Sequence, residues 1–429
     1  MTGPLRVAAT LAVFAATLAL VVWRPRGWSE AWWTVLGAVV MVALGLVTPS
    51  EVVAATLAGK SALLFLLSLL LLSLLIGKSG FFEWAAIACA RLARGDARAL
   101  YRNTFLLGAI VTAVLSLDTT AVILTPVVLA LVRRIKVPAA PFIVLCAFVA
   151  NVGSLLLPIS NLTNLLFADT FHLAFATFAA HMLAPQVVAL AITYALLRLH
   201  FRRELPARFE AAALPAAASV VPHRGYFVAC VAVLALVLLG YFLAPLAGLE
   251  PYVVAFGGGG VLIVAGAITG RVRPRAAGEL AWGVFPFVMG LFVCVRGLEN
   301  LGLAAASAAW VTRLAAGSTG SLLVIAGATA LASNVVNNLP AALIARPLLA
   351  QAHANPGAVL AALVGTDVGP MITPFGSLAT MLVLTLARRD GQAPSAGRLI
   401  GLGAWTTPLI VAGTTLALAF LGAAAVGSG

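Results

Sequence analysis

The chain has 429 residues, of which 62% are hydrophobic and only 9% are charged. A soluble protein of this length needs far more charged surface, so the composition excludes an ordinary soluble domain. The formal net charge of +13 comes from short arginine clusters between apolar blocks, for example 91–102 and 198–208. This placement is typical of the positive-inside rule of membrane proteins. No basic face with interleaved aromatic residues is present, so nucleic acid is not an expected partner.

Apolar blocks long enough to cross a bilayer follow one another through the first half of the chain. Three predicted spanning helices come first, and the first of them lacks the cleavage site of a signal peptide. An amphipathic stretch, two apolar blocks interrupted by polar residues, and a last spanning helix follow. In chain order these elements are 7–23, 31–47, 61–77, the amphipathic 81–95, the interrupted 103–132 and 138–171, and 179–199.

The same series returns after a predicted cytoplasmic linker, 200–224, which is rich in Arg, Pro and Ala. A shift of 216 positions places 151–164 on 367–380 with identical Val, Gly, Pro and Leu at four positions. This similarity predicts two internal repeats, 1–199 and 225–429. The second series comprises 225–243, 252–270, 281–295, the amphipathic 301–313, the interrupted 321–344 and 356–386, and a last helix from 400.

The number of membrane crossings can be derived if the block 103–132 is a re-entrant hairpin with its tip at Asp118. Each repeat then has five spanning helices and one hairpin, and the second repeat is inverted relative to the first. With the N-terminus outside, all but five of the 26 Lys and Arg residues fall on the cytoplasmic side. Charge alone does not distinguish the hairpin from two full spans. We expect an all-α polytopic protein of two inverted repeats in the bacterial inner membrane, with both termini outside.

Polar residues at membrane depth concentrate in the four interrupted blocks. A helix broken in hydrocarbon leaves peptide groups unpaired, so such breaks persist only beside a water-filled cavity or a bound solute. The half-helices beyond the breaks point N–H groups and positive dipole ends at the site. We therefore predict that two hairpin tips and two breaks meet near the midplane and bind a solute. The alternative is that single Ser and Thr residues bond their own helix and single Asn residues join two helices.

Two carboxylates, Asp118 and Asp367, lie within these segments. Intramembrane carboxylates are costly, and desolvation favours their protonated form, so both are candidate proton carriers. The alternative is a purely structural carboxylate held by helix N-termini. The four cysteines and five histidines show no disulfide or metal-ligand spacing, so neither a metal nor a cofactor is expected. No nucleophile–His–acid grouping is present, which argues against an intramembrane hydrolase, and we expect a membrane transporter and not an enzyme.

The segment 365–380 (GTDVGPMITPFGSLAT) closely resembles the signature of the arsenite/antimonite efflux permeases, the ArsB family. Segments 118–126, 158–164 and 334–340 resemble other parts of the same family, in the same order. They are shared more loosely with sodium/proton antiporters and dicarboxylate carriers of the wider ion-transporter superfamily.

The resemblance implies export of arsenite and antimonite driven by proton influx, sometimes with a cytoplasmic ATPase subunit. It also implies that amide and hydroxyl side chains bind the metalloid and that Asp118 and Asp367 carry protons. The implied substrate-binding residues are Asn161, Asn164, Asn337, Asn338, Ser377 and Thr380, and the hydroxyls of Thr119 and Thr120 at the first tip are further candidates.

Two other functions stay open. One is a sodium/proton antiporter or carboxylate carrier on the same scaffold, although no basic residue lies in the four segments to bind a multiply charged anion. The other is a membrane subunit that only anchors an ATPase through the arginine-rich linker.

Overall fold

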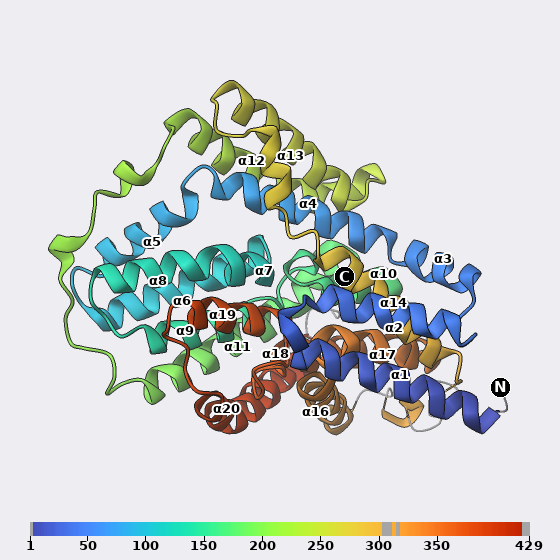
Figure 1. Cartoon of the computed structure of the whole chain (residues 1–429). Coiled ribbons are helices and arrows are strands. Elements are labelled where there is room, and N and C mark those ends of the chain that lie inside the picture. Colours follow the sequence, from blue (N-terminus) through green and yellow to red (C-terminus); the bar gives the residue numbers. More distant parts are fainter. Residues whose placement is uncertain (1–2, 303–310, 315–317, 423–429) are drawn as a thin grey trace.

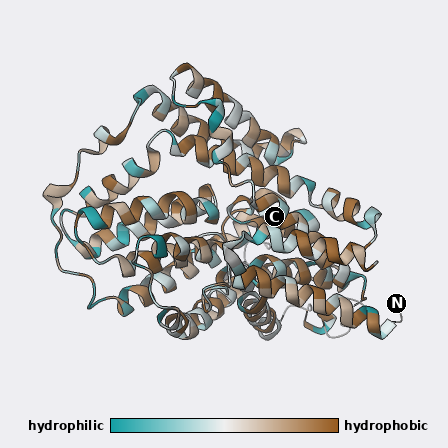
Figure 2. Cartoon of the chain, in the orientation of Figure 1, coloured by the Kyte–Doolittle hydropathy of each residue, from teal (hydrophilic) through white to brown (hydrophobic). Residues whose placement is uncertain are grey.

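The structure is a computed structural model that describes residues 3–302, 311–314 and 318–422 (Figure 1). Within these ranges the chain is helical, with no β-strand beyond an isolated bridge between Asp96 and Arg208. Eight of the described helices are long and apolar enough to cross a membrane. Hydrophobic residues predominate along the helices (Figure 2). The prediction of an all-α polytopic membrane protein is confirmed.

The first half begins with helices of different length from those expected. The predicted span 31–47 stops early, and a separate helix begins at Pro49 because Thr48 forms a capping box with Glu51. The Thr48 N–H donates to the Glu51 carboxylate at 2.8 Å, and the Glu51 N–H donates to Thr48 Oγ1 at 3.3 Å. In order, the helices are α1 (Gly3–Trp23), α2 (Glu30–Ala43), α3 (Pro49–Ala58), α4 (Lys60–Gly77), α5 (Phe81–Leu92), α6 (Ala97–Val114), α7 (Leu117–Thr119), α8 (Thr125–Arg134), α9 (Ala139–Val152), α10 (Leu162–Thr170) and α11 (Phe175–His200).

A second series of helices follows an irregular linker. The linker lies against the first hairpin, since the Phe209 N–H donates to the Gly95 carbonyl and Arg134 donates to the Ala213 carbonyl, both at 2.9 Å. The predicted amphipathic stretch 301–313 lies mostly outside the described residues. The helices are α12 (Arg224–Leu243), α13 (Pro251–Ile268), α14 (Val284–Glu299), α16 (Thr319–Val336), α17 (Asn338–Gln351), α18 (Pro356–Val368), α19 (Leu378–Arg389) and α20 (Ala396–Ala417).

Helices of the two halves pack in matching pairs. Helix α2 packs against α1 and α14, and α13 correspondingly packs against α12 and α4. The hairpin helices behave alike, since α6 packs on α9 and α16 packs on α18. Helix α4 of the first half therefore packs against helices of the second half, and α14 of the second half packs against helices of the first half.

The contact between α16 and α18 is especially close because two glycines face α16. A Cβ atom at Gly365 would lie 2.2 Å from the Ala326 carbonyl oxygen, and one at Gly369 would lie 2.4 Å from Ala330 Cα. Small residues four apart permit this close approach of membrane helices. The last turn of α18, which carries Asp367, is therefore held against the second hairpin.

Candidate solute-binding site

The first hairpin reverses at Ser116, whose φ of 151° is unusual for a residue other than glycine. Its side chain accepts a hydrogen bond from the Thr119 N–H and so caps the returning arm. Asp118 lies in this first turn and is half-buried. The arm continues through one π-helical segment, Thr120–Leu124, into α8. The tip therefore directs a carboxylate and a helix start toward the centre of the protein.

The second hairpin reverses at Asn337, which has a φ of 78°. Asn337 caps α17 and also donates to the Phe375 carbonyl at 3.0 Å, while the Asn338 N–H donates to the Gly376 carbonyl at 2.8 Å. Asn334 Oδ1 accepts from the N–H groups of Ile372 and Thr373, at 3.1 and 2.9 Å. The second tip thus satisfies peptide groups that the break between α18 and α19 leaves unpaired.

The break between α9 and α10 is closed in a similar way by side chains. Asn164 donates to the carbonyls of Ser154 and Leu157, at 2.7 and 3.2 Å. Gln186 of α11 accepts from the Leu155 N–H at 3.0 Å and donates to the Val152 carbonyl at 2.8 Å. Both side chains are buried, and they keep the interrupted backbone in a fixed shape.

Asp367 is completely buried where α18 ends. Its Oδ1 atom accepts hydrogen bonds from Thr163 Oγ1 at 2.6 Å and from Asn161 Nδ2 at 3.0 Å. Its Oδ2 atom has no hydrogen-bond partner among the described residues. A matching contact joins the other break, since Asn151 Nδ2 donates to Thr380 Oγ1 at 2.9 Å. The end of each interrupted helix therefore contacts the start of the half-helix from the opposite half.

All four interrupted segments meet around one small cavity of about 40 Å³. The first residues of four helices, α7, α10, α17 and α19, line its wall, and α4 and α14 complete it. Asp118, Asn161, Asn337 and Asn338 supply its polar side chains. Four helix N-termini around one cavity give it a positive potential, which suits oxygen atoms of a solute. At α17 the first two N–H groups are already bonded to the Gly376 carbonyl and to Asn337 Oδ1, so this helix contributes its dipole and the Asn337 and Asn338 side chains.

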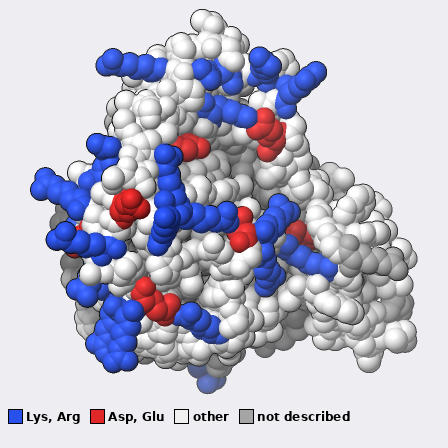
Figure 3. Space-filling model, turned by 60° about the vertical axis from the view of Figure 1, so that its left-hand side comes forward, with Lys and Arg blue, Asp and Glu red and all other residues white. Residues whose placement is uncertain are grey.

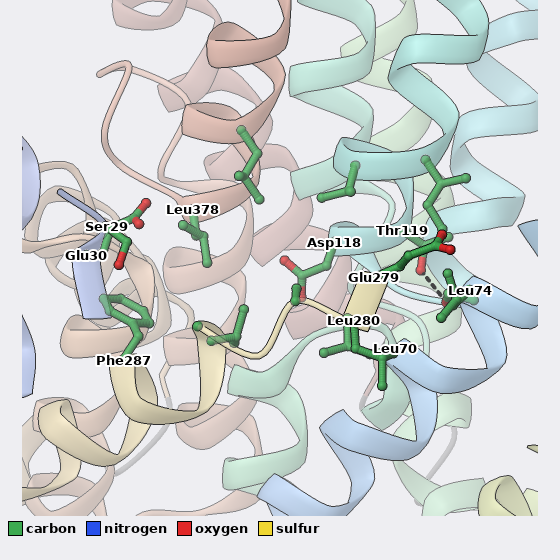
Figure 4. A pocket seen from close by; sticks show the side chains of 17 residues that line it. Ser29, Glu30, Leu70, Leu74, Asp118, Thr119, Glu279, Leu280, Phe287 and Leu378 are labelled. Atoms are coloured by element: carbon green, nitrogen blue, oxygen red, sulfur yellow. Dashed lines mark hydrogen bonds between the residues drawn. The ribbon is translucent and has the colours of Figure 1, made fainter. Parts of the chain in front are cut away.

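A larger cavity of about 400 Å³ adjoins the small one and shares Asp118, Phe287 and Leu378 with it. In Figure 4 the Asp118 carboxylate lies near the middle of this larger cavity, between Phe287 and Thr119. Thr119 Oγ1 is hydrogen-bonded to Ser73 Oγ of α4 at 2.7 Å. Glu30 and Glu279 also line this cavity, and in Figure 4 they lie on opposite sides of Asp118. Figure 3 shows one face of the protein, where Lys and Arg side chains gather around a hollow.

The predicted site residues thus fall into two groups. Asp118, Asn161, Asn337 and Asn338 line the small cavity, and Thr119 lines the larger one. The other predicted residues are buried and line neither cavity. Two of them stabilise helix ends or breaks: Asn164 bonds to the backbone of the first break, and Ser377 caps α19. The remaining three bond to other side chains, Thr120 to Thr112, Thr380 to Asn151 and Ser377, and Asp367 to Asn161 and Thr163.

Sequence reasoning did not select Ser73, Gln186 or Phe287 for the site. Ser73 and Gln186 are single polar residues inside apolar helices, and their polarity was the one available signal. Phe287 lies in a wholly apolar stretch, so nothing in the pattern marks it. Among the described residues, no three His, Cys, Asp or Glu side chains are grouped to hold a metal ion.

The family model described as "ArsB: Arsenical pump membrane protein" matches residues 9–423. The chain belongs to the ArsB family. Arsenical pump membrane proteins of Escherichia coli (strain K12) and Yersinia enterocolitica are 32% and 33% identical to it, over 95% of this chain and 97% of theirs. This ArsB-family chain is therefore a multi-pass membrane transporter and not an enzyme.

Two solved structures share the fold of this ArsB-family chain. The YdaH transporter of Alcanivorax borkumensis has a TM-score of 0.58 at 18% identity, covering 94% of this chain and 98% of that one. MtrF of Neisseria gonorrhoeae has a TM-score of 0.57 at 14% identity, covering 86% and 84%. At these identities the similarity concerns the fold alone.

Proposed function

We propose that this ArsB-family transporter exports arsenite and antimonite from the cytoplasm in exchange for protons. The observation that carries the proposal is the small cavity, where four helix starts and the polar groups of Asp118, Asn161, Asn337 and Asn338 meet. The relatives at 32% and 33% identity are arsenical pump membrane proteins, and this supplies the class of substrate.

The cavity suits a small neutral trihydroxide. Its volume of about 40 Å³ has room for about three or four water-sized groups, and arsenous acid has one arsenic and three oxygen atoms. Peptide N–H groups and Asn amides can donate to the solute oxygens, while Asp118 and the amide oxygens can accept from its hydroxyls. None of the four cysteines lines this cavity, so recognition depends on hydrogen bonds and not on thiolate bonds to arsenic.

Asp367 and Asp118 are the proposed proton carriers. Asp367 is buried and leaves Oδ2 without a protein partner, and an ionised carboxylate in this position is costly unless it takes up a proton. Asp367 is connected to the solute cavity by Asn161, because the Asn161 amide donates a hydrogen bond to the Asp367 carboxylate and also lines the cavity. Protonation of Asp367 weakens its hold on the Asn161 amide, and this couples proton uptake to the shape of the solute site.

The proposed topology places both termini outside in the bacterial inner membrane, with two inverted repeats, residues 1–199 and 225–429. Helix pairing supports the repeats, because α1–α2–α14 in one half corresponds to α12–α13–α4 in the other. In this orientation the larger cavity lies on the cytoplasmic side, because part of its lining, Ser29, Glu30 and 279–281, comes from the connections 24–30 and 269–283, so the conformation is one that admits solute from the cytoplasm. A neutral solute leaving as protons enter gains about 2.3 kcal/mol per charge per 100 mV.

Everted membrane vesicles from an efflux-deficient strain, and proteoliposomes containing the purified protein alone, test the proposal. We expect arsenite to accumulate inside when the lumen is acidic, and a protonophore to abolish this accumulation. Accumulation driven by a sodium gradient, or of a dicarboxylate in place of arsenite, would support the alternative carriers of this scaffold. Failure of the protein alone to move any of these solutes would support a subunit that only anchors an ATPase.

A further inference from the structure

A third cavity, of about 230 Å³, lies between α3, α14 and α17. It is at the end of the protein opposite to the arginine-rich face, near α3 in Figure 1. Helix α14 runs past all three cavities: Val284 and Phe287 line both the large and the small one, and Phe292 and Glu299 line the third. Helix α17 likewise contributes Asn338 to the small cavity and Leu343 to the third. The three cavities are therefore arranged in series along α14, and α17 passes the small and the third of them.

The third cavity also corresponds to the large one by the internal repeat. A shift of 222 positions places Leu70, Ser73 and Leu74 of α4 on Phe292, Val295 and Arg296 of α14. The first three residues line the large cavity and the second three line the third cavity. The same shift places Ala58 and Gly59 on Leu280 and Ala281, which line the third and the large cavity respectively. Equivalent faces of the two halves thus enclose both cavities.

We propose that the third cavity is the exit vestibule of the solute and that a charged cluster, Glu51, Arg296, Glu299 and Arg346, closes its mouth in this conformation. The identity of the solute as arsenite or antimonite rests on the proposed function, whereas the vestibule itself does not.

An apolar barrier separates the vestibule from the small cavity. Phe292, Leu339 and Leu343 are buried members of one hydrophobic cluster between the two spaces. The Phe292 ring packs directly on the backbone where α3 meets α4, because a Cβ atom at Gly59 would lie 2.1 Å from the ring. Solute can pass only when α17 or α14 moves relative to this junction.

The charged cluster lies outside this barrier. Arg296 pairs with Glu299 at 3.1 Å and with Glu51 at 3.5 Å, and so links α14 to α3. Arg346 of α17 is half-buried, lines the same cavity, and has Glu299 and Asp169 as its acidic neighbours. The charges therefore connect the three helices that must separate to open the vestibule. The two guanidinium groups also donate hydrogen bonds to a hydroxylated solute and disfavour cations in the passage.

Accessibility of an engineered thiol tests the vestibule directly. The background is Cys89→Ala, because Cys146, Cys230 and Cys294 are buried and Cys89 is the partly exposed native thiol. Leu343→Cys reports on the vestibule and Leu74→Cys, at a half-buried position, reports on the large cavity, each with a membrane-impermeant maleimide applied from one side. The background without an added cysteine gives the baseline for each side.

We expect slow labelling of Leu343→Cys from outside and fast labelling of Leu74→Cys from the cytoplasmic side. Adding Glu299→Gln leaves Arg296 and Arg346 without their shared acid. This change should raise outside labelling at position 343 about threefold to fivefold, the size expected for loss of partly exposed ion pairs, and lower labelling at position 74. Glu250→Gln, at an exposed carboxylate outside the cluster, is the matched control and should change neither rate.

Labelled Leu343→Cys should also lose solute efflux, because the adduct fills the passage. Two results would overturn the proposal: no labelling of position 343 from outside in any variant, or full labelling with unchanged efflux. If the unlabelled protein does not move arsenite at all, the proposed function fails, but the accessibility pattern still decides whether the vestibule opens.

Discussion

The Thr163 hydroxyl donates a 2.6 Å hydrogen bond to Asp367 Oδ1 across 204 residues of sequence. It joins α10 of the first half to α18 of the second. At the other break, Asn151 Nδ2 of α9 in the first half donates to Thr380 Oγ1 of α19 in the second half at 2.9 Å, across 229 residues of sequence. Neither half can therefore form the solute cavity alone, and a change at one break is transmitted to the other half.

Thr163→Val should lower transport strongly, whereas Thr163→Ser should retain most of it. Valine has nearly the shape of threonine but cannot donate to Asp367, and a hydrogen bond to a charged group contributes about 1.5–3 kcal/mol. We expect a transport rate reduced roughly tenfold or more in the valine variant. Arsenite uptake into everted vesicles at matched expression measures this effect. Equal rates in both variants would show that Thr163 serves packing alone.

Asp367→Asn should abolish proton-coupled export while the protein still inserts. Asparagine keeps the size of the side chain but can neither bind nor release a proton. Growth of an efflux-deficient strain on arsenite measures the loss. Asp390→Asn is the control, because Asp390 pairs with Arg133 on the surface and such pairs contribute about 0–1 kcal/mol. Full arsenite resistance with Asp367→Asn would exclude the proton role.

The interrupted helices were predictable from sequence because Gly, Pro, Asn and Asp stand out in apolar surroundings. The separate helix α3 was missed, although Thr48-Pro49-Ser50-Glu51 is a capping-box pattern, because its 10 residues are too few to register as a membrane span. Gln186 was also missed, because one polar residue in a long apolar helix usually bonds within its own helix. Its role becomes visible only when α11 is placed beside the first break.

The sequence likewise did not predict which polar residues line the small cavity. Asn161 and Asn164 lie one turn apart in the same motif, yet Asn161 lines the cavity and Asn164 bonds to the broken backbone. The irregular stretch between α9 and α10 sets the direction of α10, and helical periodicity does not continue through it. The sequence therefore identified the segments that form the site more reliably than the side chains that face it.

Gly369→Ala should destabilise the protein, because the added methyl group would lie 2.4 Å from Ala330 Cα. Overpacking of this kind typically costs about 1–3 kcal/mol. Gly327→Ala on α16 is the control, since a Cβ atom there has no neighbour within 4 Å and alanine favours a helix. We expect a lower Tm in detergent for Gly369→Ala and an unchanged or higher Tm for Gly327→Ala. Equal Tm values would contradict the close packing of α16 on α18.

Replacement of all four cysteines by alanine should leave transport largely intact. Cys146, Cys230 and Cys294 are buried in apolar packing, Cys89 is partly exposed, and none of the four lines the large cavity, the small cavity or the proposed exit vestibule. Thiolates are the strongest protein ligands for soft metals, so a carrier that held arsenic through sulfur would lose binding altogether. A carrier that uses amides, hydroxyls and helix N-termini would lose only some stability from the small cavities that alanine leaves. Arsenite binding and Tm, measured together on the purified variant, separate the two cases: lost binding at a nearly normal Tm would overturn recognition by hydrogen bonds.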